Sequence, residues 1–278
     1  MFEIPQPSLI DKVRFTVTSG LSRLGLYVGW KQKQIIVCGY PRGGTSLFYN
    51  MLSTTISDNY RFTEFEEYYI YHIHKLGSIA TKAPLDIFHI KFLEDLNIHG
   101  KVASVFVILR DIREVLTSRH PFLPREYFIG FDNSWWPQDK EFKSWKYDAP
   151  GVIEISREIK QILGKENIMA IRYEELMLNA DAVQEKISDE FNMSFDYPFS
   201  KYYERSDKLA YSYNGKYQPV DSSLVLEGKP VKIKKPRWMA PEHKERIVDQ
   251  FTNCPELFDI LIDQGYEANN TWFERIAK

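Results

Sequence analysis

A short apolar segment that runs directly into a glycine-rich loop constrains the fold of this chain more than any other feature. Residues 34–38 (QIIVC) are mostly apolar and favour a β-strand, which ends at Gly39. The following loop contains Gly43 and Gly44, and residues 46–52 after it have helical character. A buried strand, a tight loop and a helix in this order predict one unit of an α/β fold with a parallel sheet.

Two further segments extend this pattern. Residues 102–109 are almost wholly apolar and lead into the polar turn at Arg110 and a plausible helix. Residues 168–172 form another expected strand, between the helix-like stretches 152–163 and 174–191. The alternation predicts an α/β fold, a P-loop-type doubly wound parallel sheet flanked by helices.

The length of 278 residues and the hydrophobic content of 44% suit one large domain with a sizeable core. We expect an N-terminal helical extension over residues 1–33 and the main domain over residues 34–278. Residues 8–28 are amphipathic, and we expect them to pack on the main domain, with peripheral membrane contact as the alternative. Two long irregular segments, 121–150 and 212–237, are expected to form substrate-side loops.

Charge and cysteine content narrow the possible partners and compartment. Lys plus Arg (36) nearly balances Asp plus Glu (38), so nucleic acid is not an expected partner and any anion site must be local. Cys38 and Cys254 match neither a disulfide framework nor a metal-ligand spacing. The sequence starts without a signal-peptide pattern and contains no membrane-spanning segment, so we expect a cytoplasmic protein.

Residues 39–46 (GYPRGGTS) have the spacing of a phosphate-binding loop, in which backbone N–H groups and a helix N-terminus hold phosphate oxygens. Thr45 stands where an ATPase loop needs its lysine, and the cation is Arg42 inside the loop. The loop is therefore expected to bind phosphate without handling a triphosphate. An ordinary glycine-rich turn is the alternative. The predicted ligand-binding residues of the loop are Pro41, Arg42, Gly43, Gly44, Thr45 and Ser46.

A second anion site is expected after the second strand. Arg110 follows that strand, and Ser118 comes two helical turns later. Both side chains can then address one anion at the carboxyl edge of the sheet. Two anion sites along one edge fit a ligand with two separated phosphate groups.

These motifs resemble the family of sulfotransferases that use 3′-phosphoadenosine 5′-phosphosulfate (PAPS). Residues 41–46 (PRGGTS) are similar to the family's 5′-phosphosulfate loop, and residues 108–111 (ILRD) with Ser118 are similar to its 3′-phosphate motif. The resemblance runs from about residue 34 to residue 266, and it is closer to the tyrosylprotein and glycan branches than to the cytosolic branch. Serine is usual at the position of Gly43, which leaves this loop without a hydroxyl near the sulfate.

The resemblance also implies further binding residues. Residues 173–176 (YEEL) are similar to the family's Y-E-x-L segment, which assigns Tyr173 to the nucleotide site. Residues 229–231 (KPV) are similar to the family's K-P loop, which assigns Lys229 to the same site.

Sulfuryl transfer needs cations at the leaving phosphate oxygen and a base at the acceptor. Arg42 and Lys82 are the expected cations, and the resemblance implies that Lys82, in the sequence TKAP, contacts the sulfate. No histidine follows this lysine, unlike in the cytosolic branch. The resemblance to the other branches implies a glutamate base, for which we select Glu64 with Glu66 as a near-equal alternative. No metal is expected, and four histidines are interpreted as structural: His72, His74, His89 and His99.

The sequence thus predicts in-line transfer of a sulfuryl group from PAPS to a hydroxyl or amine of a small-molecule or glycan acceptor, leaving 3′-phosphoadenosine 5′-phosphate (PAP). A P-loop small-molecule kinase is a rival that Thr45 disfavours. A nucleotide- or glycan-binding module without catalysis is the other rival, and it would not need Lys82 or Glu64. The aromatic residues of segment 121–150, among them Trp135 and Trp136, fit an acceptor wall and core packing equally well.

Overall fold

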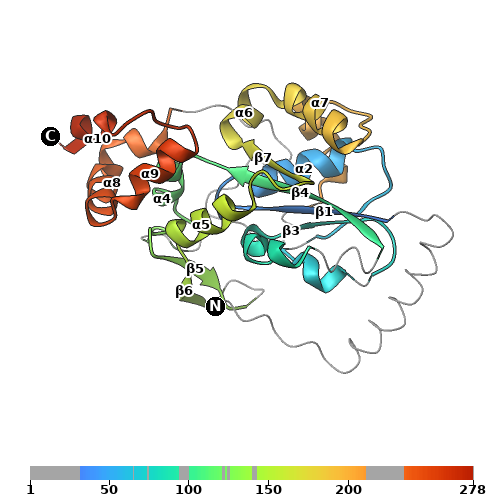
Figure 1. Ribbon diagram of the computed structural model, residues 1–278, viewed down its shortest axis with the longest axis horizontal. Coiled ribbons are helices and arrows are strands. Elements are labelled where there is room, and N and C mark those ends of the chain that lie inside the picture. Colours follow the sequence, from blue (N-terminus) through green and yellow to red (C-terminus); the bar gives the residue numbers. More distant parts are fainter. Residues whose placement is uncertain are drawn as a thin grey trace.

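A five-stranded parallel sheet forms the centre of the computed structural model (Figure 1). The structure describes residues 32–64, 66–73, 75–93, 100–120, 123, 126–139, 143–210 and 235–277. The strand order is β2-β3-β1-β4-β7, and every pairing is parallel. The predicted α/β fold class is therefore confirmed. The strands are β1 (Gln32–Gly39), β2 (Arg61–Phe62), β3 (Ile79–Lys82), β4 (Lys101–Leu109) and β7 (Ile168–Arg172).

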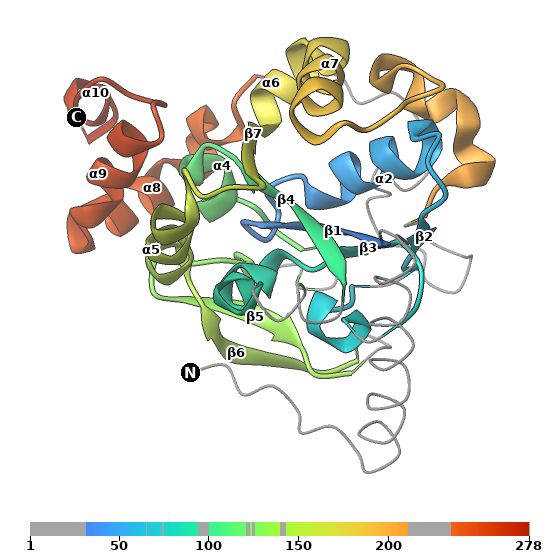
Figure 2. The ribbon, with the colours of Figure 1, turned by 45° about the vertical axis from the view of Figure 1, so that its right-hand side comes forward.

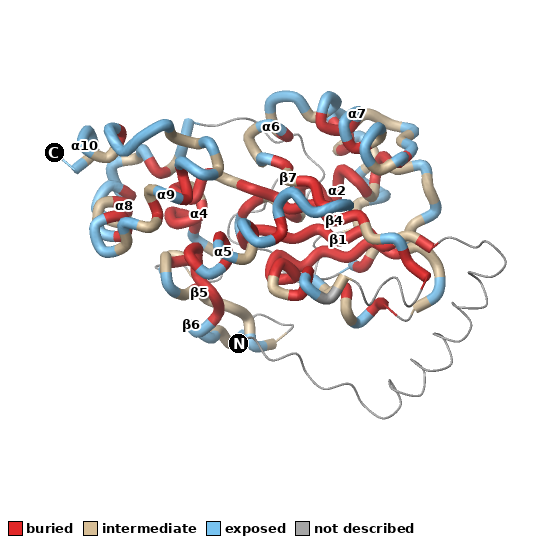
Figure 3. The backbone as a smooth tube through the Cα atoms, in the orientation of Figure 1, coloured by how far each residue is buried: buried red, intermediate tan, exposed pale blue. Residues whose placement is uncertain are grey.

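Side chains of the central strands alternate between two cores, one on each face of the sheet. Ile35 and Val37 of β1 face the first core, and Ile36 and Cys38 face the second. Both strands β1 and β4 are buried over most of their length (Figure 3). This two-sided burial explains why the strands read as continuous apolar runs in the sequence.

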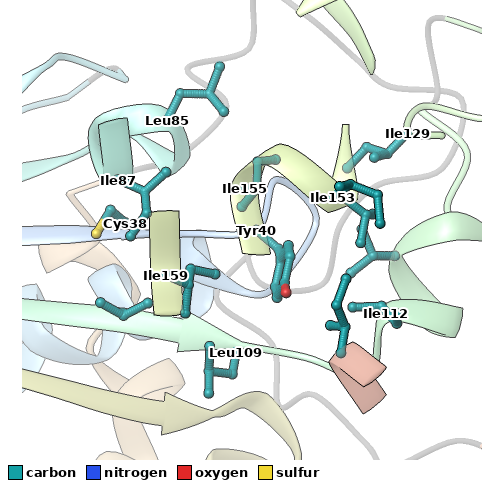
Figure 4. Close-up of a cluster of buried hydrophobic side chains, with 14 of the residues drawn as sticks. Cys38, Tyr40, Leu85, Ile87, Leu109, Ile112, Ile129, Ile153, Ile155 and Ile159 are labelled. Atoms are coloured by element: carbon teal, nitrogen blue, oxygen red, sulfur yellow. The ribbon is translucent and has the colours of Figure 1, made fainter. Parts of the chain in front are cut away.

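Helices cover both faces. The first core is covered by α2 (Thr45–Thr55), α6 (Tyr173–Leu178), α7 (Ala180–Phe191) and the 3₁₀ segment η4 (Phe199–Lys208). The second core is covered by η1 (Tyr69–His72), η2 (Pro84–Phe88), η3 (Ile90–Phe92), α4 (Ile112–Leu116) and α5 (Val152–Ile162). Figure 4 shows part of the second core, with Cys38, Ile87 and Ile155 among its labelled side chains.

Most predicted elements are found at or near their expected positions. The strand expected over residues 168–172 is β7, and the helix expected over residues 152–163 is α5. The stretch 174–191 forms two helices, because Asn179 has a non-helical backbone (φ −139°, ψ 49°). Strands β2 and β3 were not predicted, since segments of two and four residues carry too little periodicity. The predicted extension over residues 1–33 lies almost entirely outside the described residues.

The expected loop 121–150 contains an antiparallel hairpin. Its strands are β5 (Asn133–Pro137) and β6 (Trp145–Pro150), with a register shift between Ser134 and Trp135. Figure 2 shows the hairpin on the same side of the sheet as α5. Trp135, Trp136 and Trp145 are half-buried and pack against the second core. The structure thus gives these indoles a packing role.

The C-terminal residues form a helical unit beyond one end of the sheet (Figure 1). Its members are η5 (Arg237–Met239), α8 (Pro241–Asn253), α9 (Glu256–Asp263) and α10 (Thr271–Ala277). Aromatic rings hold the unit together: the Phe251 centroid lies 5.0 Å from both Phe258 and Trp272. Within the described part of the chain, no helix combines the length and the apolar character needed to cross a membrane.

A buried lysine lies at the edge of the sheet opposite the glycine-rich loop. Lys101 pairs with Gln32 at the start of β4 and is 1% exposed. Its ammonium group donates hydrogen bonds to the His72 carbonyl (2.9 Å) and to Gln34 Oε1 (3.3 Å). Burial lowers the pKa of Lys101 to about 7, and nearby positive charges add to this effect.

This lysine predicts a pH dependence of stability. Between about pH 7 and pH 9 the unfolded chain holds the Lys101 proton and the folded protein does not, so stability should rise with pH. The slope is at most about 1.4 kcal/mol per pH unit for one proton. Urea unfolding of the parent and of Lys101→Met between pH 7 and pH 9 measures this slope. The substitution should remove the part of the slope that comes from Lys101. Lys33→Met, which alters a half-buried lysine paired with Asp58, should keep the slope. Equal slopes in parent and Lys101→Met would show that Lys101 is charged in the fold.

Candidate functional site

Four neighbouring strands of the sheet bring the predicted site residues to one edge. The glycine-rich loop follows β1, Lys82 ends β3, Arg110 follows β4 and Tyr173 follows β7. The carboxyl ends of parallel strands meet at the same edge of a sheet, where open α/β sheets bind ligands. The chain places β3 and β4 on opposite sides of β1. The glycine-rich loop after β1 therefore lies at the position in the sheet where the chain turns from adding strands on one side of β1 to adding them on the other.

The loop turns tightly between β1 and α2. The backbone N–H of Gly43 donates to the Tyr40 carbonyl (2.9 Å), and the ring of Tyr40 is buried beneath the loop. The Tyr40 hydroxyl contacts Ser156 Oγ at 2.7 Å and accepts from Gln264 Nε2 at 2.6 Å. Burial raises the pKa of Tyr40 to about 12, so this hydroxyl keeps its proton at neutral pH. Tyr40 thus anchors the loop to α5 and to the C-terminal helices.

The two adjacent glycines are required by close contacts. A Cβ atom on Gly43 would lie 2.7 Å from the Tyr40 carbonyl oxygen, so a serine there could not be accommodated without moving the backbone. Gly44 has a left-handed backbone (φ 104°), and a Cβ atom on it would lie 2.4 Å from the Tyr173 ring. The absence of a side chain at Gly43 therefore has a steric reason in this chain.

Arg42 connects the loop to the predicted second anion site. It is the exposed residue at the tip of the loop and has a left-handed backbone (φ 63°). Its Nε donates to Ser118 Oγ (3.0 Å), and its carbonyl accepts from Arg110 Nη1 (2.8 Å). The Arg110 guanidinium in turn lies over the Tyr173 ring, 4.2 Å from its centroid. The structure thus brings together the residues assigned to the two anion sites.

Two further residues join this group that the sequence analysis did not select. Glu114 Oε2 lies 3.3 Å from Arg110 Nη2 and 3.5 Å from Arg237 Nη2. The other oxygen of Glu114 accepts from the Trp238 backbone N–H (3.1 Å). In the sequence, the i, i+4 spacing of Arg110 and Glu114 indicates that these two side chains can pair. Arg237 carried no such signal, because it comes from a distant part of the chain.

Lys82 lies at the base of the site beside the glycine-rich loop. Its side chain is fully buried, and its ammonium group donates to Ser46 Oγ (3.1 Å) and to Glu66 Oε1 (2.5 Å). Ser46 is in the first turn of α2, so Lys82 contacts the helix that follows the glycine-rich loop. Glu66 remains about one-third exposed. A buried ammonium group thus joins the loop to a carboxylate that solvent can reach.

Glu64, the first-choice base, borders a pocket. It is exposed and lines a pocket of about 360 Å³ between β2, α2 and the end of η4. Lys82 and Ser46 do not belong to the lining of that pocket. Glu66, the second choice, contacts the ammonium group of Lys82. Lys229, the remaining predicted binding residue, lies outside the described residues.

The histidines that the structure describes have several roles. His72 is buried, contacts Glu67 and lies beside Lys101 at the opposite edge of the sheet. His89 is buried and contacts the carboxylate of Asp86 (3.1 Å). His120, which the sequence analysis did not consider, lies nearer the loop: burial and then the charge of Arg42 lower its pKa to about 3.

His74 and His99 lie outside the described residues. In the described part of the chain, no group of three or more His, Cys, Asp or Glu side chains is arranged to hold a metal ion.

Comparisons with known proteins found a likeness in fold alone. No family model matches the sequence, and no curated protein matches it. Among solved structures, the chain is similar to mouse sulfotransferase SULT7A1, which was crystallised in complex with PAP. The TM-score is 0.44 and the identity 13%, over 83% of this chain and 88% of that one. A likeness at this level says nothing about activity.

The contact between Gly44 and Tyr173 generates a prediction. Gly44→Ala should lower the free energy of unfolding by about 1–3 kcal/mol more than Gly164→Ala, because only the first substitution forces a Cβ atom into a ring. Gly164 is a matched control, since it also has a left-handed backbone (φ 83°) but open space around it. Urea unfolding of both variants measures the difference. Equal losses would mean that Tyr173 does not pack against the loop.

Proposed function

We propose that this chain is a sulfotransferase that moves a sulfuryl group from PAPS to a hydroxyl or amine of a small-molecule or glycan acceptor. The observation that carries the proposal is the position of Lys82. Its buried ammonium group contacts both Ser46 at the phosphate loop and the accessible carboxylate of Glu66. A donor group bound on the loop would thus have a cation and a carboxylate beside it.

Two anchors for the donor nucleotide support the proposal. The loop with Arg42 would hold the 5′-phosphosulfate, and Arg110 with Ser118 would hold the 3′-phosphate, as in the family that the motifs resemble. Arg42 contacts Ser118 in the structure, and Ser118 is buried beneath it. A bound 3′-phosphate would therefore take the place of Arg42 at Ser118. The guanidinium would then pair with phosphate or sulfate oxygens, which it binds more strongly than a neutral hydroxyl.

The proposed chemistry is one in-line displacement. The acceptor oxygen or nitrogen forms a bond to sulfur while the bond from sulfur to the bridging phosphate oxygen breaks, and PAP leaves. Lys82 and Arg42 would stabilise the negative charge that develops on that bridging oxygen. A glutamate would accept the acceptor's proton. We propose Glu66 for this role because of its contact with Lys82, and Glu64 is the alternative.

The two rival functions use the same residues differently. A small-molecule kinase would need a cation for the β- and γ-phosphates at position 45, where this loop has the buried hydroxyl of Thr45. A binding module without catalysis would need Arg42, Arg110 and Ser118 but gain nothing from the pairing of Lys82 with Glu66. Donor preference tests the first rival and substitution of the carboxylates tests the second.

Donor preference is tested by thermal unfolding with PAP or with ATP and Mg²⁺. PAP should raise the melting temperature more than Mg·ATP does, because the site offers two separated anion anchors and a loop without its lysine. At a PAP concentration about 100 times its Kd, mass action adds about 2.7 kcal/mol to stability. Equal or greater stabilisation by Mg·ATP would contradict the proposal and favour the kinase.

Catalysis is tested by the matched pair Glu66→Gln and Glu64→Gln. Each substitution keeps the size of the side chain but removes its ability to take a proton. Glu66→Gln should lower kcat by about 10²–10⁴-fold with little change in PAP affinity, and Glu64→Gln should retain turnover. Transfer of labelled sulfur from PAPS to an acceptor panel measures this. The reverse result would identify Glu64 as the base. A fully active parent with two fully active variants would exclude both carboxylates from this role.

A further inference from the structure

The buried lysine at the edge of the sheet opposite the glycine-rich loop has no negatively charged partner among the described residues. Lys101 is 1% exposed, and its terminal nitrogen contacts two uncharged oxygen atoms, the His72 carbonyl (2.9 Å) and Gln34 Oε1 (3.3 Å). An isolated buried charge is costly, so buried amines are usually paired with a negative group or neutral. The site therefore favours either the neutral amine or a negative group that the described residues do not supply.

The charges that act on Lys101 are positive. Burial is the main cause of its low pKa, about 7, and the charges of Arg61 and Lys75 lower that pKa further. His72 is neutral at pH 7, because burial is the main factor that lowers its pKa to about 4. The carboxylate of Glu67 is engaged by His72, with 2.5 Å between Oε2 and Nε2. A negative charge at the end of the Lys101 side chain would therefore be balanced by Arg61 and Lys75.

The strand neighbour of Lys101 carries a buried hydrogen-bond donor without an acceptor. Gln32 pairs with Lys101 in the register of β1 and β4, so both side chains lie on the same face of the sheet. Gln32 is 1% exposed, and its Oε1 accepts from the Gly77 backbone N–H (2.7 Å). This contact fixes the orientation of the amide, and Nε2 then has no hydrogen-bond partner among the described residues. A buried donor of this kind indicates that the site takes a further acceptor.

We propose that Lys101 is a modification site, where its amine reacts with carbon dioxide to form a carbamate. The lone pair of Nζ forms a bond to the carbon of CO2, one carbon–oxygen π bond breaks to leave a negative charge on oxygen, and one proton leaves Nζ for solvent. The remaining N–H still donates to the His72 carbonyl, and the carbamate oxygens accept from Gln32 Nε2. The carbamate thus supplies the negative charge that the surroundings of Lys101 lack. This inference does not depend on the proposed function.

Carbon dioxide suits this site better than a free anion does. A free anion pairs with an ammonium group that keeps its proton, whereas CO2 reacts with the neutral amine and is small and uncharged, as entry to a buried position requires. At pH 8 a lysine with a pKa of about 7 is about 90% neutral, and an ordinary lysine is less than about 1% neutral. Carbamate formation near neutral pH should therefore favour Lys101 over the exposed lysines of the chain.

Carbon NMR of the protein with ¹³C-labelled bicarbonate at about pH 8 tests the proposal. The parent should give a carbamate signal that Lys101→Met loses and that Lys33→Met, at a half-buried lysine paired with Asp58, keeps. The α-amino group of the chain also titrates near this pH, so the difference between parent and Lys101→Met assigns the signal. Gln32→Glu keeps an acceptor for Gly77 but replaces the donor by a carboxylate beside Lys101. It should lower the Lys101 signal by about 10-fold or more, because the carboxylate stabilises the ammonium form.

The pH profile and a comparison of anions provide the decisive outcomes. At a fixed bicarbonate concentration, the Lys101 signal should rise between about pH 6 and pH 8 and then level off, because it follows deprotonation of the buried amine. A signal that rises only above about pH 9, or none that depends on Lys101, would overturn the proposal. Equal stabilisation by chloride and bicarbonate at one ionic strength, without a Lys101 signal, would identify a bound anion instead.

Two further measurements keep the test independent of how the variants fold. Urea unfolding verifies that each variant is folded and measures the effect of each anion. Alkylation of the carbamate in the parent, followed by peptide mass spectrometry, identifies the modified residue without any substitution. Alkylated carbamate on the peptide that contains Lys101 is the expected result, and its absence there would overturn the proposal.

Discussion

The parallel pairing of β1 with β3 and β4 is the constraint on which the rest of the structure depends. In this register Val37 lies beside Lys82 and Gly39 lies beside Ile108, so the three strands end close to one another. The ends of these strands carry the glycine-rich loop, Lys82 and Arg110. The pairing of the strands is therefore enough to make these three neighbours in space. Because β1 is buried on both faces, slippage of this register by one residue would turn its apolar side chains to the wrong cores.

The concentration of positive charge at this edge has to be held in place by the rest of the fold. Arg42 and Arg110 lie close together, which is unfavourable unless hydrogen bonds and aromatic contacts compensate for it. The compensation comes from three directions: Ser118 binds Arg42, Tyr173 packs under Arg110, and Glu114 pairs with Arg110. A site that holds its cations ready in this way can bind an anionic ligand without reorganising all of them.

Two glutamates that are close in the sequence have different surroundings in the structure. Glu64 and Glu66 are two residues apart, yet Glu66 contacts the buried ammonium group of Lys82 and Glu64 lines a pocket beside α2 and η4. Their positions in the sequence alone do not distinguish them as candidate bases. The contact with Lys82 does, and it is the physical reason to propose Glu66 as the base.

The sequence by itself determined the parallel α/β fold, the loop after β1 and the residues after β4, because continuous apolar runs and glycine-rich turns are local patterns. It also identified Lys82, Arg42 and Arg110 as candidates. It did not reveal β2 and β3, which are too short for a periodic signal. Only the tertiary structure decided that Glu66 meets Lys82 and that Arg237 reaches Glu114. Those contacts join segments separated by 16 and 123 residues. They follow from how the elements pack, which no local pattern of residues encodes.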